Sequence, residues 1–207
     1  AHCDVLIAGG GPAGLAAALA AARSGARVIV ADEGSEAGGS LLAERADIDG
    51  EPALDWVTCT LAELRALPDV TLLSRATVFG YFDHNALAIV ENAAARVPQP
   101  GIGAATQRMW KVRAAQVVLA TGALERPLVF ANNDRPGVML ASAARTYANR
   151  YAVKPGSRAV IFTNNDTAYA AALDLKASGI DVAMIIDARA GTLGHAPQQA
   201  AEPGMAR

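Results

Sequence analysis

Apolar runs in the first third of the chain predict buried strands that alternate with helices. Residues 5–8 form an unbroken apolar run, typical of a strand buried on both faces. An alanine-rich helix follows a glycine turn, and a second apolar run covers 26–31. Residues 51–67 have apolar side chains at helical spacing, and 70–73 predict a short strand. This order predicts an α/β fold on a parallel sheet.

Three β-rich runs in the middle of the chain predict an antiparallel insertion. They cover 76–82, 86–90 and 108–113, with turn residues between them. Residues 98–103, rich in proline and glycine, are expected to form a surface loop. A further buried strand then ends in Thr121-Gly122. This step is expected at the carboxyl edge of the sheet, where ligands bind in open α/β folds.

The second half predicts another strand–helix–strand unit, over 157–162, 168–177 and 181–187. Its first turn contains no glycine, so Cβ atoms would hinder a phosphate, and Asp166 would repel one. We therefore expect no dinucleotide at this turn.

The predicted fold is a Rossmann-like, doubly wound parallel sheet with an inserted antiparallel three-stranded element and an incomplete second βαβ domain. The expected domains are a dinucleotide-binding domain over 1–135, a partial second nucleotide-binding-like domain over 136–190, and a disordered tail over 191–207. The chain is expected to be a fragment or an isolated domain.

Composition limits the possible partners. The 207 residues have a formal net charge of −2, which gives no field to attract nucleic acid. The longest uncharged stretch, 6–22, is interrupted by glycines and does not predict a membrane span. No basic segment precedes it, so we expect a cytoplasmic protein.

No catalytic or metal site is predicted. Cys3 and Cys59 are too far apart in sequence for a redox dithiol. His2, His84 and His195 lack the spacing of metal ligands. No nucleophile–base set or paired carboxylate site stands out.

The most informative motif is Gly9-x-Gly11-x-x-Gly14, which lies between the first strand and its helix. Gly9 is expected to make the tight turn, Gly11 to admit a pyrophosphate, and Gly14 to let helix and strand pack closely. Pro12 suits the start of the helix, and the helix amides, including that of Ala13, would hold phosphate charge.

An acidic pair supports this interpretation. Asp32 and Glu33 end the second strand, about 20 residues after the motif, where a carboxylate bonds ribose hydroxyls. Their charge disfavours a 2′-phosphate, so NAD or FAD is preferred over NADP. Because NAD and FAD share an ADP half, the motif does not separate them. Gly39 and Ser40, in the glycine-rich segment beyond, are also candidate contacts.

Several motifs together resemble a known family. The glycine motif, the Gly38-Gly39 pair and the Ala120-Thr121-Gly122 step resemble the two-dinucleotide-binding flavoproteins. The runs 120–127, 132–140 and 77–83 more specifically resemble the alpha subunits of heterotetrameric sarcosine oxidases. The similarity extends from about Cys3 to Arg189 and covers only the nucleotide-binding part of that longer subunit.

The resemblance implies a function in a larger enzyme. The family complex oxidises sarcosine to glycine, formaldehyde and hydrogen peroxide, with FAD and FMN mainly in the beta subunit. The expected partners are the beta, gamma and delta subunits, and the isolated chain is not expected to be catalytically competent. The alpha subunit is expected to hold NAD in its first site. The cofactor-binding residues are then predicted as Gly9, Gly11, Pro12, Ala13, Gly14, Asp32, Glu33, Gly39, Ser40, Val78, Thr121 and Gly122.

Two alternatives stay open. In the first, the chain is an FAD-binding subunit of a related amino-acid or opine dehydrogenase. In the second, it is a non-catalytic assembly module with a structural nucleotide.

Overall fold

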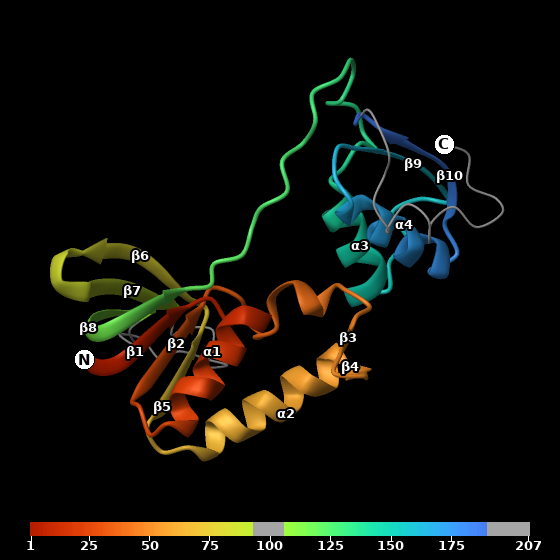
Figure 1. Cartoon of the computed structure of the whole chain (residues 1–207). Coiled ribbons are helices and arrows are strands. Elements are labelled where there is room, and N and C mark those ends of the chain that lie inside the picture. The colour runs from red at the N-terminus through yellow and green to blue at the C-terminus, as the bar shows by residue number, and fades with distance from the viewer. Residues whose placement is uncertain (93–105, 190–207) are drawn as a thin grey trace. The chain divides into compact units, whose positions relative to one another are not determined.

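The computed structural model describes residues 1–92 and 106–189. The strands of residues 1–119 form one six-stranded sheet, apart from the short β3–β4 pair. Its strand order is β5-β2-β1-β8-β7-β6. The strands are β1 (His2–Ala8), β2 (Val28–Asp32), β5 (Val70–Ser74), β6 (Ala76–Phe82), β7 (Ala86–Asn92) and β8 (Gln107–Leu119). β1 pairs in parallel with β2 and β8, and β2 pairs in parallel with β5 (Figure 1). The carboxyl ends of these four strands therefore meet at one edge.

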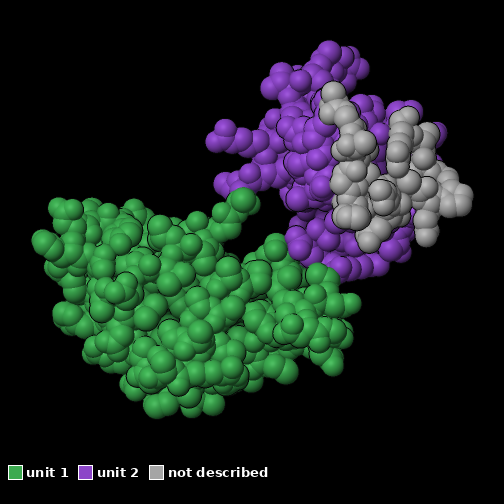
Figure 2. Space-filling view, viewed as in Figure 1, with its two compact units in different colours: residues 1–41, 46–123 green, residues 42–45, 124–207 purple. Residues whose placement is uncertain are grey.

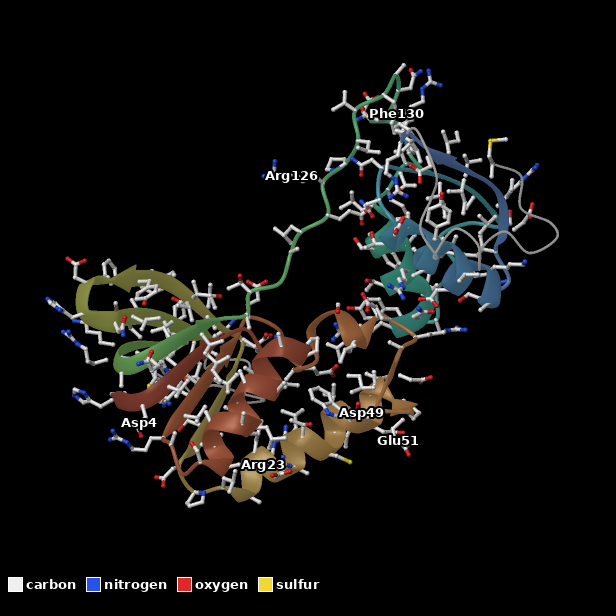
Figure 3. The ribbon with its side chains drawn as sticks, in the orientation of Figure 1. Asp4, Arg23, Asp49, Glu51, Arg126 and Phe130 are labelled. Carbon is white, nitrogen blue, oxygen red and sulfur yellow. The ribbon has the colours of Figure 1, made fainter. Side chains whose placement is uncertain are left out.

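Two helices cover one face of the parallel strands (Figure 1). They are α1 (Pro12–Arg23) and α2 (Ala53–Ala66). Leu15 and Ala18 of α1 and Leu64 of α2 are fully buried against this face. In the last turn of α1, Arg23 donates from Nε and Nη2 to the Glu63 carboxylate on α2, at 2.7 and 2.8 Å (Figure 3). The helices thus hold together the strands whose ends build the site.

The antiparallel strands cover the other face. β6 packs against β2, and Ile29 of β2 shares a core cluster with Leu87 and Ile89 of β7. In this unit, helices and strands therefore bury opposite faces of the parallel strands. The α/β class with a Rossmann-like, mainly parallel sheet is confirmed.

The third antiparallel strand differs from the prediction. The runs 108–113 and 116–122 were expected as separate strands, but most of both lies in the single strand β8. β8 pairs antiparallel with β7 and in parallel with β1. Only Ala114 and Ala115 separate the two runs, and neither favours a turn. The insertion is therefore continuous with the parallel sheet.

The connections include two short strands, β3 (Asp47–Ile48) and β4 (Glu51–Pro52), which pair antiparallel. They shorten the helix predicted from residue 51, since Pro52 becomes the N-cap of α2. 3₁₀ turns cover Gly39–Leu42 and Asp83–Asn85.

The chain divides into two units, with 1–41 and 46–123 in the first, and 42–45 and the chain from residue 124 in the second (Figure 2). The sequence placed this boundary at residue 135. The Glu125 carboxylate accepts hydrogen bonds from the backbone amides of Ala141 and Ser142, at 3.2 and 2.8 Å. These amides begin α3 (Ala141–Arg150), so the segment after Ala123 belongs with the second unit.

The second unit contains the predicted βαβ unit, formed by β9 (Arg158–Thr163), α4 (Thr167–Ala177) and β10 (Asp181–Asp187). β9 and β10 pair in parallel, as predicted. Ile161 and Val182 pack with residues of α3 and α4 in a common core. Between these helices, Arg145 forms an ion pair with the buried Asp174 carboxylate.

The predicted loop at 98–103 and the predicted tail at 191–207 lie outside the described residues. Within residues 1–92 and 106–189, no helix is long and apolar enough to cross a membrane.

Candidate functional site: the carboxyl edge of the parallel strands

Three chain segments meet where β1, β2 and β8 end. The Gly9 amide, just after β1, donates to the Ala31 carbonyl of β2 at 2.8 Å. The Ala120 amide, just after β8, donates to the Ala8 carbonyl at 2.8 Å. The glycine motif and Thr121 are therefore neighbours, although they are far apart in sequence.

Gly9 and Gly14 permit this close approach. Gly9 has φ +110°, and a Cβ there would lie 2.1 Å from the Ala120 carbonyl oxygen. A Cβ on Gly14 would lie 1.9 Å from the Gly9 carbonyl oxygen. Both distances are far below van der Waals contact, and both neighbouring atoms belong to the backbone. A side chain at either position would therefore displace the turn or the helix.

Gly11 has a different environment. It is the N-cap of α1 with φ −76°, and a Cβ there would approach only the Gly39 Cα, at 3.7 Å. Packing within the described fold therefore does not require glycine at this position. What its missing side chain provides is access to the start of α1.

The start of α1 is ready to accept an anion. Pro12 is the first helical residue, no side chain caps the helix, and no acidic residue lies in its first turn. Ala13 is exposed and Gly14 is buried. Amides at a helix start carry partial positive charge and favour an anionic ligand.

The glycine pair after β2 lies against this helix start. The Gly38 amide donates to the Gly10 carbonyl at 2.8 Å. Gly39 has φ +56°, and a Cβ on it would lie 2.8 Å from the Gly11 Cα. The two glycine turns are therefore in close contact, and Gly39 is exposed beside the start of the helix.

Asp32 is fixed at the same edge by two backbone amides. Its Oδ2 accepts a hydrogen bond from the Gly10 amide at 2.5 Å, and its Oδ1 accepts one from the Gly34 amide at 2.7 Å. A carboxylate oxygen accepts more than one hydrogen bond, so lone pairs remain for hydroxyl donors. The sequence did not single out Gly10 or Gly34. The run of three glycines and the glycine after the acidic pair were the available signals.

The remaining predicted residues divide into two groups. Glu33, Ser40, Thr121 and Gly122 are exposed and follow strand ends or the glycine pair. Val78 instead lies within β6 and packs on the core cluster of Ile29 and Leu87. Its predicted contact with the cofactor stays a prediction, since Val78 lies on β6, which packs beside β2.

The corresponding turn of the second unit is occupied by its own side chains. Arg189 donates from Nη2 to Asp187 at 2.6 Å and to Asp166 at 2.7 Å, and the Tyr169 hydroxyl donates to Asp187 at 3.0 Å. The guanidinium of Arg189 is the main reason why the pKa of Asp187 lies well below its usual value. The Asp187 carboxylate, which ends β10 as Asp32 ends β2, thus already has an internal partner.

The first edge fits the ADP half of a dinucleotide. Its uncapped helix amides suit a diphosphate, its glycine turns place no side chain beside them, and Asp32 suits ribose hydroxyls. These features define a dinucleotide-binding α/β domain.

The chain belongs to the FAD-dependent oxidoreductase family, whose model matches residues 4–118. The matched region contains most of β1, all of α1 and β2 and nearly all of β8, and therefore the glycine motif and Asp32.

Curated relatives give a more specific similarity. The chain is 53% identical over 189 residues to the sarcosine oxidase alpha subunit of Rhizobium meliloti (strain 1021), covering 91% of this chain and 19% of that protein. It is 51% identical to the same subunit of Corynebacterium sp. (strain P-1), covering 99% of this chain and 21% of that protein. An opine oxidase subunit of Agrobacterium tumefaciens (strain Ach5) is 34% identical, with 94% of this chain and 40% of that protein covered. The identity to sarcosine oxidase alpha subunits confirms the predicted resemblance. The chain spans about a fifth of the length of these subunits.

Solved structures share the fold. The L-proline dehydrogenase of P. horikoshii superimposes with a TM-score of 0.71 at 26% identity, covering 90% of this chain and 35% of that one. The thioredoxin reductase of Lactococcus lactis, at 19% identity, has a TM-score of 0.68 and is covered over 63% of its length by 98% of this chain.

Proposed function

We propose that this chain is the dinucleotide-binding part of the alpha subunit of a sarcosine-oxidase-type amine oxidase and that NAD is its ligand. The observation that carries the proposal is the placement of Asp32, which two glycine amides hold beside the uncapped start of α1. Identity above 50% to sarcosine oxidase alpha subunits supports the choice of enzyme class.

The residues at the edge of the sheet have separate tasks in this proposal. Amides at the start of α1 donate to the diphosphate, which Gly11 lets approach. The free lone pairs of Asp32 accept hydrogen bonds from the adenosine ribose. Glu33 is exposed next to Asp32, and its charge disfavours a phosphate on the ribose.

The proposed complex oxidises sarcosine, with uptake of one water, to glycine and formaldehyde and reduces oxygen to hydrogen peroxide. When bound, a dinucleotide of this kind supplies a ring that exchanges two electrons. The described residues supply binding and orientation, and we propose that the beta subunit, with FAD and FMN, performs the oxidation. The gamma and delta subunits complete the proposed assembly.

The nucleotide that the purified chain carries tests the ligand. The chain is denatured, and the released nucleotide is identified by chromatography and mass spectrometry. NAD from a colourless protein supports the proposal. A nucleotide-free chain that binds neither NAD nor FAD contradicts it.

FAD is the second candidate, because the matching family model describes FAD-dependent oxidoreductases and an opine oxidase subunit is similar over 94% of the chain. In that function the same edge holds the ADP half of a flavin, in a subunit of a related amino-acid or opine dehydrogenase. Yellow protein that releases FAD on denaturation favours this candidate.

A nucleotide with only a structural role gives a different result again. The chain is then expressed with the other subunits, and the complex is assayed for hydrogen peroxide from sarcosine. If removing the nucleotide lowers the melting temperature but leaves turnover unchanged, the chain is an assembly module and its ligand takes no part in the reaction.

A further inference from the structure

An apolar groove lies on the antiparallel half of the first unit, away from the dinucleotide edge. Its volume is about 420 Å³, and its lining comes mainly from β6, β7 and β8. We call it the β6–β8 groove and define it by Phe79, Phe82, Ala88, Met109, Lys111 and Arg113. Val78, Ile89 and Trp110 are paired across the same three strands and pack on the core cluster of the unit.

The groove departs from the usual composition of a solvent-facing sheet. Antiparallel sheets with one buried face normally present polar side chains on the other. Here Phe79, Phe82 and Met109 are 57%, 60% and 58% exposed. Three large apolar side chains that line one groove and remain this exposed are typical of a surface that binds another molecule.

A β-bulge brings the two phenylalanines together. Val78 pairs with Ile89 and Gly80 with Ala88, so Phe79 is an extra residue in β6. In a regular strand, residues 79 and 82 would point to opposite faces, but a bulge redirects side chains. A Cβ on Gly80 would lie 2.5 Å from the Phe82 ring, so glycine at this position lets that ring lie across the sheet.

The charges of the groove are all basic. Lys111 and Arg113 follow Met109 at every second residue of β8 and therefore share its face, and the lining contains no acidic residue. Arg113 donates to the His84 carbonyl oxygen at 3.1 Å. Within 1–92 and 106–189, no carboxylate forms an ion pair with Lys111 or Arg113. A chain of net charge −2 thus has a local basic surface around an apolar groove.

We propose that the β6–β8 groove binds a protein segment that presents an apolar side chain flanked by carboxylates. The apolar side chain packs between Phe79, Phe82 and Met109, over the small side chain of Ala88. The carboxylates pair with Lys111 and Arg113, so charge sets the orientation and the identity of the partner. Two cations are fewer than the about four to eight that anchor a protein to anionic lipid, which favours a protein partner over a membrane.

A random peptide library displayed on phage tests this chemistry without a known partner. Selection on the intact chain is expected to enrich peptides with an apolar residue between Asp or Glu residues. Titration of the selected peptide, made synthetically, is expected to shift the NMR amide signals of β6, β7 and β8. Enrichment of peptides without carboxylates, or shifts confined to other elements, overturns the proposal. Failure to enrich any peptide also overturns it.

Two variants and a control separate the apolar and charged contributions. The K111E/R113E chain is expected to bind the acidic peptide at least about fivefold more weakly and to select basic peptides instead. The F79S/M109S chain is expected to lose binding while its fold persists, because both side chains are more than half exposed. The control R65E changes an exposed cation on α2 and is expected to leave binding unchanged. Equal binding by all variants contradicts the proposal, as does binding of phosphatidylserine vesicles that the peptide does not displace.

Discussion

Replacing Gly11 with alanine separates ligand binding from folding at the glycine turn. Gly11 has φ −76° and ψ −175°, which alanine adopts without strain. The added Cβ would lie 3.7 Å from the Gly39 Cα, an ordinary contact distance. We therefore expect the G11A chain to fold.

Two small effects on the free energy of unfolding oppose each other in G11A. Alanine restricts the unfolded chain, which stabilises the fold by about 0.4–1 kcal/mol. Alanine is also a poorer N-cap than glycine, a loss of about 0.5–1 kcal/mol. The net change is expected to stay below about 1 kcal/mol, which shifts the melting temperature by about 4 °C at most.

Binding responds more strongly, because the new methyl group occupies the path of the diphosphate. A hydrogen bond from a backbone amide to a charged group contributes about 1.5–3 kcal/mol. Loss of one such bond weakens binding about 10- to 100-fold. Loss of two such hydrogen bonds multiplies the two fold-changes in affinity.

Calorimetric titration with NAD and FAD measures the binding, and thermal melting by circular dichroism measures the fold. The matched control is G156A in the second unit, where a Cβ would lie 3.8 Å from the Arg158 carbonyl oxygen. This control is expected to leave binding unchanged and, by the same restriction of the unfolded chain, to shift the melting temperature by about 4 °C at most. A G11A chain that melts normally and binds both dinucleotides with unchanged affinity refutes the assignment of Gly11.

Three further changes test other parts of the molecule. Arg27 holds the pKa of the exposed Asp4 carboxylate at about 2, so the stabilisation is present above about pH 4 and is lost as the pH falls toward 2. R27Q removes the guanidinium but keeps the backbone amide of residue 27, which also donates to Asp4. The NMR titration midpoint of Asp4 is therefore expected to rise in R27Q while staying below the ordinary value, and an unchanged midpoint contradicts the pairing. R145A leaves the Asp174 carboxylate buried without its cation. The variant is expected to lower the free energy of opening of α4, measured by hydrogen exchange, by about 3–5 kcal/mol. If loss of the cation is the cause, the double variant R145M/D174L recovers most of this free energy. G14A places a Cβ 1.9 Å from the Gly9 carbonyl oxygen. The variant is expected to lower the free energy of unfolding, measured in urea, by about 1–3 kcal/mol. An unshifted urea midpoint would rule out that clash.

Local patterns made much of the fold predictable. The continuous apolar run before Gly9 and the run before Asp32 became neighbouring parallel strands, because strands buried on both faces leave a clear signal. The glycine motif located the turn for a similar reason, since its spacing reflects backbone conformation and close packing. The placement of Asp32 at the edge of the sheet was predictable because it ends a strand that the apolar run marks clearly.

Features that depend on contacts between distant segments were not predictable in this way. The merger of two predicted strands into β8 depends on a change of partner from β7 to β1. The amides of Gly10 and Gly34 meet Asp32 only after folding. The assignment of 42–45 to the second unit likewise has no local signal, because it depends on Arg145 and Asn149 of α3, which bind Glu44 and the Ala43 carbonyl.

Competition by ADP-ribose tests the dinucleotide site most directly, because this ligand retains the diphosphate and the adenosine ribose and has no redox ring. Calorimetric titration is expected to show one ADP-ribose site per chain. Saturation of that site is expected to block NAD and FAD, and D32N is expected to weaken all three ligands by at least about tenfold. A chain that binds NAD or FAD equally well in the presence of saturating ADP-ribose would contradict a site built for the ADP half.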